Sequence, residues 1–170
     1  MSEAGQGAGE EAGQRVRRAR PSDVEGIVEL CRGLAVYEKA PDEFLMTAEQ
    51  LDTALFGPAP QVFAHVAESA GVVVGCAVWF LTFSTWDGVH GIYLEDLYVT
   101  PEQRGTGLGF ALLAELAKEC VSNGYTRLQW AVLDWNTPSI EFYDKLGAKP
   151  LDEWITYRLS GDALTELGSR

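Results

Sequence analysis

The stretch YLEDLYVTPEQRGTGLG, residues 93–109, decides the fold of this chain. It starts as an apolar strand that carries two adjacent carboxylates, Glu95 and Asp96, and then passes through a short turn that contains a proline. Arg104 and three alternating glycines follow and open a long amphipathic helix. Alternating glycines leave backbone N–H groups uncovered beside a helix N-terminus, where the aligned peptide dipoles favour an anion. We therefore expect a phosphate-bearing cofactor close to two proton acceptors, which favours an enzyme over a binding module.

Length and composition predict one domain behind a short tail. The chain has 170 residues, of which 46% are hydrophobic, and this is enough to bury one good core. Residues 1–13 are rich in Gly, Ala and Glu and carry no positive charge, so we expect a disordered tail and a single domain over 14–170. No apolar run approaches the roughly 18–20 residues of a membrane helix, so we expect no membrane partner.

Net charge and cysteine content limit the kinds of partner and the cellular compartment that we expect. The formal net charge is -12, which disfavours DNA or RNA and suits either a cationic small molecule or simple solubility. Cys31, Cys76 and Cys120 show no metal or redox spacing and lie in apolar stretches, which predicts reduced, buried thiols in a cytoplasmic protein. His65 and His90 lie far apart in the sequence, so we expect no metal site.

The periodicity of apolar residues predicts an α/β domain with a mixed sheet. Capping-box patterns at Ser22–Glu25 and Thr47–Gln50 mark the starts of two helices. Turn signals between the three central strands indicate an antiparallel meander. The expected order is a strand from residue 16, helices from 22 and 47, strands over 61–68, 72–83 and 91–99, a helix over 106–122, a strand over 127–133, a helix over 137–147 and a strand over 154–159.

Three kinds of glycine loop are considered for residues 104–109. The phosphate loop of nucleotide triphosphatases ends in Gly-Lys-Ser/Thr, whereas Phe110 follows Gly109 here. The dinucleotide fingerprint fails because Phe110 and Leu112 occupy the positions of its third glycine. The remaining pattern, Arg-x-x-Gly-x-Gly, resembles the coenzyme A pyrophosphate loop of the GNAT superfamily of N-acetyltransferases.

The resemblance extends from Val16 to Leu159, and four segments are similar to the diamine (spermidine/spermine) acetyltransferase branch. These segments are LAVYE (34–38), YLED (93–96), DWNTPSI (134–140) and FYDKLGA (142–148). The resemblance implies the GNAT fold, a central mixed, mostly antiparallel twisted sheet of about six or seven strands with about four helices. It also implies a β-bulge that splays the strand carrying Glu95 from the strand starting near Arg127.

The two carboxylates need that bulge to act together. Consecutive strand residues point to opposite faces, so Glu95 and Asp96 reach one cleft only where the strand is distorted. The alternative is a pair of solvated carboxylates on an edge strand. By the resemblance, Glu95 is the general base, acting directly or through a water, and Asp96 holds the cationic substrate.

The resemblance also assigns the other site residues. It implies Tyr143 as the acid that protonates the leaving thiolate, although a buried tyrosine is otherwise a common core residue. Asn136 and Ser139 would contact the coenzyme, although Asn136 also suits a helix cap. The coenzyme-binding positions implied are Leu97, Tyr98, Val99, Arg104, Gly105, Thr106, Gly107, Leu108, Gly109, Asn136 and Ser139. The substrate positions implied are Tyr37, Glu38, Trp86, Glu95, Asp96, Glu153 and Trp154, for which ordinary packing is the alternative.

These observations predict direct acetyl transfer from acetyl-CoA to a primary amine, without a metal and without a covalent enzyme intermediate. A di- or polyamine is the first candidate, although the loop before Trp154 is shorter than in the diamine branch. A lysine- or thialysine-like amino acid is the second, and a protein lysine the third. A non-catalytic acyl-CoA sensor is the alternative outside enzymes. The family resemblance implies a homodimer.

Overall fold

The computed structural model describes residue 13 and residues 15–170, in two compact units that meet at Ala131 and Val132. The tail predicted over 1–13 lies, except for Gly13, outside the described residues. The two units are treated separately below, and the single-domain interpretation stays a prediction.

The first unit is built on a five-stranded sheet in the order β1-β2-β3-β4-β5. The first four strands pair as antiparallel neighbours, whereas β5 runs parallel to β4. The bounds are β1 Arg15–Arg18, β2 Val62–Ser69, β3 Val72–Ser84, β4 Val89–Val99 and β5 Leu128–Gln129. This arrangement confirms the mixed, mostly antiparallel sheet.

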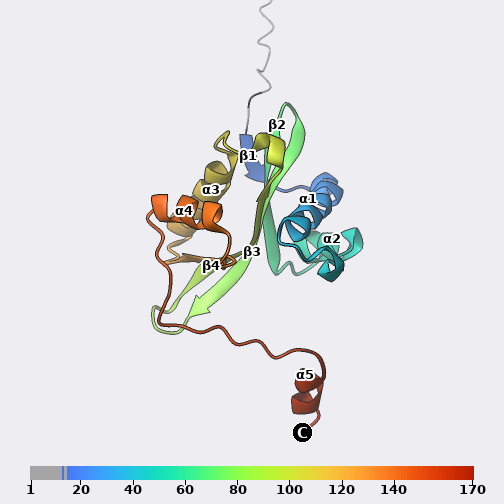
Figure 1. The fold of residues 1–170 in the computed structure, drawn as a ribbon, viewed down its shortest axis with the longest axis vertical. Coiled ribbons are helices and arrows are strands. Elements are labelled where there is room, and N and C mark those ends of the chain that lie inside the picture. The colour runs from blue at the N-terminus through green and yellow to red at the C-terminus, as the bar shows by residue number, and fades with distance from the viewer. Residues whose placement is uncertain (1–12, 14) are drawn as a thin grey trace, which may run out of the picture. The chain divides into compact units, whose positions relative to one another are not determined.

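Helices cover the sheet of the first unit on both faces. In Figure 1, α1 (Val24–Tyr37) and α2 (Ala48–Phe56) lie on one side of the sheet and α3 (Leu108–Asn123) lies on the other. The apolar stripe of α1 and α2 packs on β2 and β3 around side chains such as Ile27, Val66 and Cys76. The sheet therefore has a separate apolar layer on each face, as expected for an α/β domain.

The capping predictions had different outcomes. Thr47 and Gln50 form the predicted box, with the Thr47 N–H donating to Gln50 Oε1 at 2.9 Å and the Gln50 N–H to Thr47 Oγ1 at 3.2 Å. The Ser22–Glu25 box is wrong. A short 3-10 turn, η1 (Pro21–Asp23), precedes α1, and Asp23 is the N-cap residue. Its carboxylate makes no cap bond to the helix because Arg17 and the Arg20 N–H occupy it.

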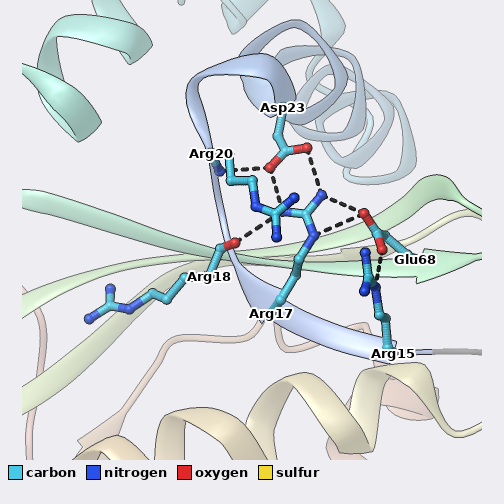
Figure 2. A network of polar contacts seen from close by, with 6 residues as sticks. All are labelled: Arg15, Arg17, Arg18, Arg20, Asp23 and Glu68. Atoms are coloured by element: carbon cyan, nitrogen blue, oxygen red, sulfur yellow. Dashed lines mark hydrogen bonds and ion pairs between the residues drawn. The ribbon is translucent and has the colours of Figure 1, made fainter.

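Arg17 bridges two carboxylates where β1 leads into α1 (Figure 2). Its Nη1 and Nη2 atoms donate to Asp23 at 2.7 and 2.9 Å, and its Nε donates to Glu68 on β2 at 2.9 Å. Arg15 forms an additional ion pair with Glu68. The network fixes the start of α1 to the first two strands.

The second unit contains α4 (Thr137–Lys145) and α5 (Gly161–Gly168). The strand predicted over 154–159 is wrong, because these residues are irregular and their side chains are exposed. An extended segment without a neighbouring strand gains no ladder hydrogen bonds, so apolar residues alone do not make it a strand. The predicted strand over 127–133 is reduced to β5. The described residues thus hold five strands and five α-helices, where about six or seven strands and four helices were expected.

Two further 3-10 turns lie in the first unit, η2 (Pro41–Glu43) before α2 and η3 (Pro101–Gln103) after β4. Helix α3 starts at Leu108, two residues later than predicted, and Gly124 ends it with φ at 70°. Glycine suits this left-handed cap because it has no Cβ.

Candidate functional site

A β-bulge lies at the two carboxylates of β4. Leu94 pairs with Trp79 and Asp96 pairs with Val78, so Glu95 has no partner on β3. Trp79 and Val78 are consecutive and face opposite sides of the sheet, so the bulge sends Leu94 and Asp96 to opposite sides as well. Asp96 is half-buried, and Glu95 is exposed. The bulge predicted for this strand is confirmed.

Asp96 lies on the side of the sheet that α1 covers. Burial raises the pKa of its carboxyl to about 6, helped by the charges of Glu95 and Glu38, while a hydrogen bond from Cys31 opposes the rise. Burial also raises the pKa of Glu38, the C-cap residue of α1. Three carboxyl groups therefore share one region, and a cationic group would relieve their mutual repulsion.

Strand β4 leaves part of one edge open beyond the bulge. Its parallel neighbour β5 pairs only with Ile92 and Tyr93. Within the described residues of the first unit, the edge from Leu94 to Val99 on that side has no strand partner. This is the predicted splay, and it leaves the β5 side of residues 97–99 without a strand partner, where another extended chain could pair.

Arg104 adopts a position that the sequence did not indicate. Its Nε donates to the Val99 carbonyl at 3.1 Å, and its guanidinium lies over the rings of Tyr37 and Tyr98 at 4.8 and 5.3 Å from their centroids. Tyr98 in turn packs against Gly33 of α1, where an added Cβ would lie only 3.0 Å from the ring. The start of the glycine turn is thus attached to the last turns of α1. The role of Arg104 at a diphosphate stays a prediction.

The glycine turn itself has the conformation that an anion site requires. Gly105 and Gly107 have φ of 78° and 91°, and Gly107 is the N-cap residue of α3. A Cβ added at Gly105, Gly107 or Gly109 would meet nothing within 4 Å. The first N–H groups of a helix lack intrahelical acceptors and carry its positive dipole end. The turn therefore offers open space in front of unpaired donors, which fits a diphosphate.

Two neighbouring features complete the turn. The Thr106 hydroxyl donates to the Gln103 carbonyl at 2.6 Å, which holds the turn closed. Beside Leu108, the turn also borders a hollow of about 290 Å³ that it shares with Arg15 of β1 and Glu115 of α3.

The remaining predicted site residues are either exposed or belong to the second unit. Trp86, in the turn between β3 and β4, is 91% exposed. In the second unit, Asn136 accepts a hydrogen bond from the Ser139 N–H at 3.4 Å, so it caps α4 as the sequence allowed. Tyr143 lies on α4 and is half-buried, whereas Glu153 and Trp154 are exposed. Their predicted roles in binding and catalysis stay predictions.

The structure brings together six predicted residues of the first unit. These are Tyr37, Glu38, Glu95, Asp96, Tyr98 and Arg104. Sequence reasoning missed the Cys31 thiol of α1, which acts on the pKa of Asp96. Helical spacing placed Cys31 on the buried face of α1, but no sequence signal paired it with a carboxylate. Among the described residues, no group of three or more His, Cys, Asp or Glu side chains could hold a metal ion.

Comparisons with known proteins show the family and the fold of this chain. The family described as "Acetyltransferase (GNAT) family" matches residues 28–148. The chain is similar to thialysine N-epsilon-acetyltransferase of Mus musculus, with 35% identity over 94% of this chain and 99% of that protein. The Bos taurus protein of the same name is 37% identical over 91% of this chain and 97% of its own length. An integron cassette protein of V. cholerae shares the fold, with a TM-score of 0.78, 24% identity and coverage of 93% of this chain and 99% of that one.

Proposed function

The chain belongs to the GNAT family and is an acetyl-CoA-dependent N-acetyltransferase, and on that premise we propose that it acetylates the terminal primary amine of a lysine-like amino acid such as thialysine. The observation that carries the cationic acceptor is the cluster of Glu38, Glu95 and Asp96 around the bulge of β4, and the choice of a lysine-like amino acid over a diamine rests on the named activity of the relatives. The summed negative charge of this cluster selects a cationic acceptor. The named activity of the relatives supports an amino acid with a basic side chain.

Acetyl-CoA supplies an acetyl group activated as a thioester. The N–H groups at residues 105–109 would hold its diphosphate, and the open edge of β4 near Leu97 and Val99 would receive its extended arm. Arg104, stacked on two tyrosines, supplies a fixed positive charge at the same turn. Asn136 and Ser139 are the proposed contacts from α4.

Three residues of this chain are assigned to the two proton transfers and to binding the cationic group. An ammonium is not a nucleophile, so Glu95 takes its proton, directly or through a water, as the amine nitrogen bonds to the carbonyl carbon. Asp96 holds the cationic group in place. The carbon–sulfur bond then breaks as Tyr143 gives its phenolic proton to the sulfur, and the second proton lost by the nitrogen restores the Tyr143 phenol, which leaves the neutral amide and the free thiol. Tyr37, Trp86, Glu153 and Trp154 are the proposed contacts to the rest of the acceptor.

A diamine or polyamine is the second candidate. The carboxylate cluster favours it, because a second ammonium could pair with Glu38 while the first lies at Asp96. Thialysine instead carries an α-carboxylate, which this acidic region would repel unless a cation received it. The two candidates therefore differ in whether a carboxylate on the substrate helps or harms binding.

Release of free thiol from acetyl-CoA tests both candidates. The panel is thialysine, lysine, ornithine, putrescine and spermidine, each at saturating acetyl-CoA, with the reaction without amine as blank. The proposal predicts the highest kcat/KM for thialysine. A higher kcat/KM for putrescine or spermidine would transfer the assignment to the diamine class. Tight coenzyme binding in calorimetry with no amine-dependent release would instead support a non-catalytic acyl-CoA sensor.

The assembly and the compartment are proposed on separate grounds. Residues 151–159 carry exposed apolar side chains, among them Ile155 at 79% and Tyr157 at 91% exposure, and we propose that a second copy covers them in a homodimer. Sedimentation velocity of the purified protein tests this, and a monomer at all concentrations would refute it. Cys31, Cys76 and Cys120 are buried and free, which favours the cytoplasm, to be checked by fractionation.

Net charge and helix hydropathy concern two other possible partners, nucleic acid and the membrane. The net charge of -12 disfavours nucleic acid, so we expect no retention on DNA at low salt. None of the described helices has the length and apolar character needed to cross a bilayer.

A further inference from the structure

Arg127 is a half-buried cation whose side chain lies across β4. It directly precedes β5, and its carbonyl accepts the Ile92 N–H at 3.0 Å. The side chain passes over Gly91, where an added Cβ would lie 2.5 Å from Arg127 Cγ and 3.1 Å from its Nε. A larger residue at position 91 would displace the arginine, so this glycine leaves the space that the Arg127 side chain occupies.

Arg127 has no anionic partner among the residues that the structure describes. None of the ion pairs in that part of the chain involves it, and its Nε is buried without a hydrogen bond. The hydroxyl of Thr82, which pairs with Gly91 across the two strands, is also buried without a hydrogen bond. Buried polar groups are normally paired, so two unpaired groups against one glycine need an explanation. A carboxylate on a ligand would satisfy the guanidinium, because it accepts two parallel N–H donors.

The register of β3 and β4 places these groups on the side of the sheet that carries Asp96. Val78 pairs with Asp96, and Thr82 pairs with Gly91. Val78 and Thr82 are four residues apart on β3, so they point to the same side. With a rise of about 3.3 Å per residue, the cationic and the anionic ends of this face are about 13 Å apart.

An aromatic pair lies between the two ends. Phe80 and Tyr93 are opposite each other in the register, and their half-buried rings stack with centroids 5.2 Å apart. Phe80 lies midway between Val78 and Thr82 and points to the same side as both. The face therefore presents, in order, carboxylates, an apolar surface and a guanidinium.

We propose that Arg127 binds the α-carboxylate of the acceptor while Asp96 holds its terminal ammonium group, so that Arg127 selects amino acids over diamines. The inference rests on the proposed function and names the residue that gives it an amino acid as substrate. It also supplies the cation without which the acidic region would repel such a substrate.

The dimensions and chemistry of a lysine-like amino acid fit this order. Its amine nitrogen and carboxylate carbon are about 8 Å apart when extended, and a hydrogen bond at each end adds about 3 Å. The central methylene or thioether groups would lie over Phe80 and Tyr93. The Thr82 hydroxyl both donates and accepts, so it suits a carboxylate beside an α-ammonium group. A diamine would instead bring a second positive charge toward Arg127, which disfavours its binding.

The primary test compares thialysine with thialysine amide, which lacks the carboxylate charge. In the wild type, kcat/KM should be about tenfold or more higher for thialysine, because the amide cannot form the charge-assisted pair. Arg127→Met keeps the aliphatic part of the side chain over Gly91 and should reduce this preference to less than about twofold. The loss should lie in KM for thialysine and not in KM for acetyl-CoA, because the carboxylate is remote from the reacting atoms.

Two further variants separate the carboxylate contact from charge and packing. Arg127→Lys keeps the charge but not the planar pair of donors, and it should show an intermediate preference. Arg32→Met is the matched control. It removes one positive charge from α1, where Arg32 lies over the Phe44 ring at 4.8 Å, and it should leave the ratio of the two kcat/KM values unchanged.

Calorimetry of thialysine binding to the coenzyme A complex measures the same contact without turnover. The Kd should rise by about tenfold in Arg127→Met and stay unchanged in Arg32→Met. If Arg127→Met does not fold, the wild-type comparison of thialysine with its amide and the Arg127→Lys variant decide the question.

The outcomes that would overturn the inference differ from those that would refute the proposed function. Equal kcat/KM for thialysine and its amide in the wild type, a preference retained in Arg127→Met, or an equal loss in Arg32→Met would overturn the role of Arg127. The proposed function would survive these results if thialysine still had the highest kcat/KM of the amine panel. Absence of amine-dependent thiol release in the wild type would refute the proposed function, while calorimetry would still decide whether Arg127 holds the carboxylate.

Discussion

Replacing Arg17 with methionine should destabilise the fold strongly, because it removes the cation that two buried carboxylates share. The side chains of Asp23 and Glu68 are only 6% and 8% exposed, and that of Arg17 is 16% exposed. Methionine keeps much of the aliphatic volume but none of the donors. Removing one partner from a buried ion pair costs about 3–5 kcal/mol, since the remaining charge stays desolvated.

The expected cost lies at the lower end of that range. Glu68 keeps its ion pair with Arg15, and Asp23 keeps the Arg20 N–H at 2.7 Å. We therefore expect Arg17→Met to lower the free energy of unfolding by about 3 kcal/mol, which for this chain length corresponds to a Tm lower by about 6–12 °C. Arg15→Met is the matched control. The Arg15 side chain is 60% exposed, so its loss should cost less than about 1 kcal/mol.

The pH dependence identifies the cause of the loss. The hydrogen bonds from Arg17 hold the pKa of Asp23 below its usual range, and those from Arg15 and Arg17 do the same for Glu68. A depressed pKa stabilises the fold above the unfolded-state value, and this stabilisation disappears as the pH falls through the folded-state value. The difference between wild type and Arg17→Met should therefore shrink as the pH falls from 7 to about 3, below the unfolded-state pKa of both carboxyl groups. Urea unfolding at both pH values measures it. An equal cost in Arg15→Met, or a cost of Arg17→Met that does not change with pH, would refute the reasoning.

Three further predictions concern the site and the core. Tyr143→Phe should lower kcat more than tenfold and leave the Kd for coenzyme A nearly unchanged, and equal turnover would remove Tyr143 from the mechanism. Gly107→Ala should weaken coenzyme A binding more than fivefold in calorimetry, whereas Gly124→Ala, with a similar positive φ at the other end of α3, should bear a similar strain of about 1 kcal/mol without weakening it. Burial lowers the pKa of His65 to about 4, so wild-type stability should fall by about 2–3 kcal/mol as the pH drops from about 6.5 to 4. His65→Asn keeps an acceptor for the Trp79 indole N–H, 3.2 Å away in the wild type, and should show a flatter profile.

Local features of the sequence predicted the local features of the site. The family resemblance of the segment around Glu95 and Asp96 implied a bulge, and the register at Glu95 shows that bulge. Glycine at 105 and 107 permits positive φ, and both residues adopt it beside the start of α3. The Thr47–Gln50 box depends on residues three apart, and it forms as the pattern requires.

Features that depend on distant partners were not predictable in this way. Ser22 and Glu25 have the local pattern of a capping box, but no such box forms. The N-cap residue is Asp23, whose carboxylate accepts hydrogen bonds from Arg17 and from the Arg20 N–H. The segment 154–159 has strand composition but no partner strand within the described residues. Helix α5 was not expected, although Leu164 and Leu167 have helical spacing.

The geometry of the carboxylate cluster depends on how α1 is held at its two ends. Its first turn follows Asp23, which is bound to Arg17, and its last residue, Tyr37, lies under the guanidinium of Arg104. Glu38 follows directly after the helix. Movement of α1 against the sheet would therefore change the separation of Glu38 from Asp96. Because Arg104 also begins the glycine turn, a coenzyme diphosphate bound there would act on the same end of α1. The residues proposed to bind the donor and those proposed to hold the amine thus both contact α1, and through this helix we expect one substrate to affect the affinity for the other.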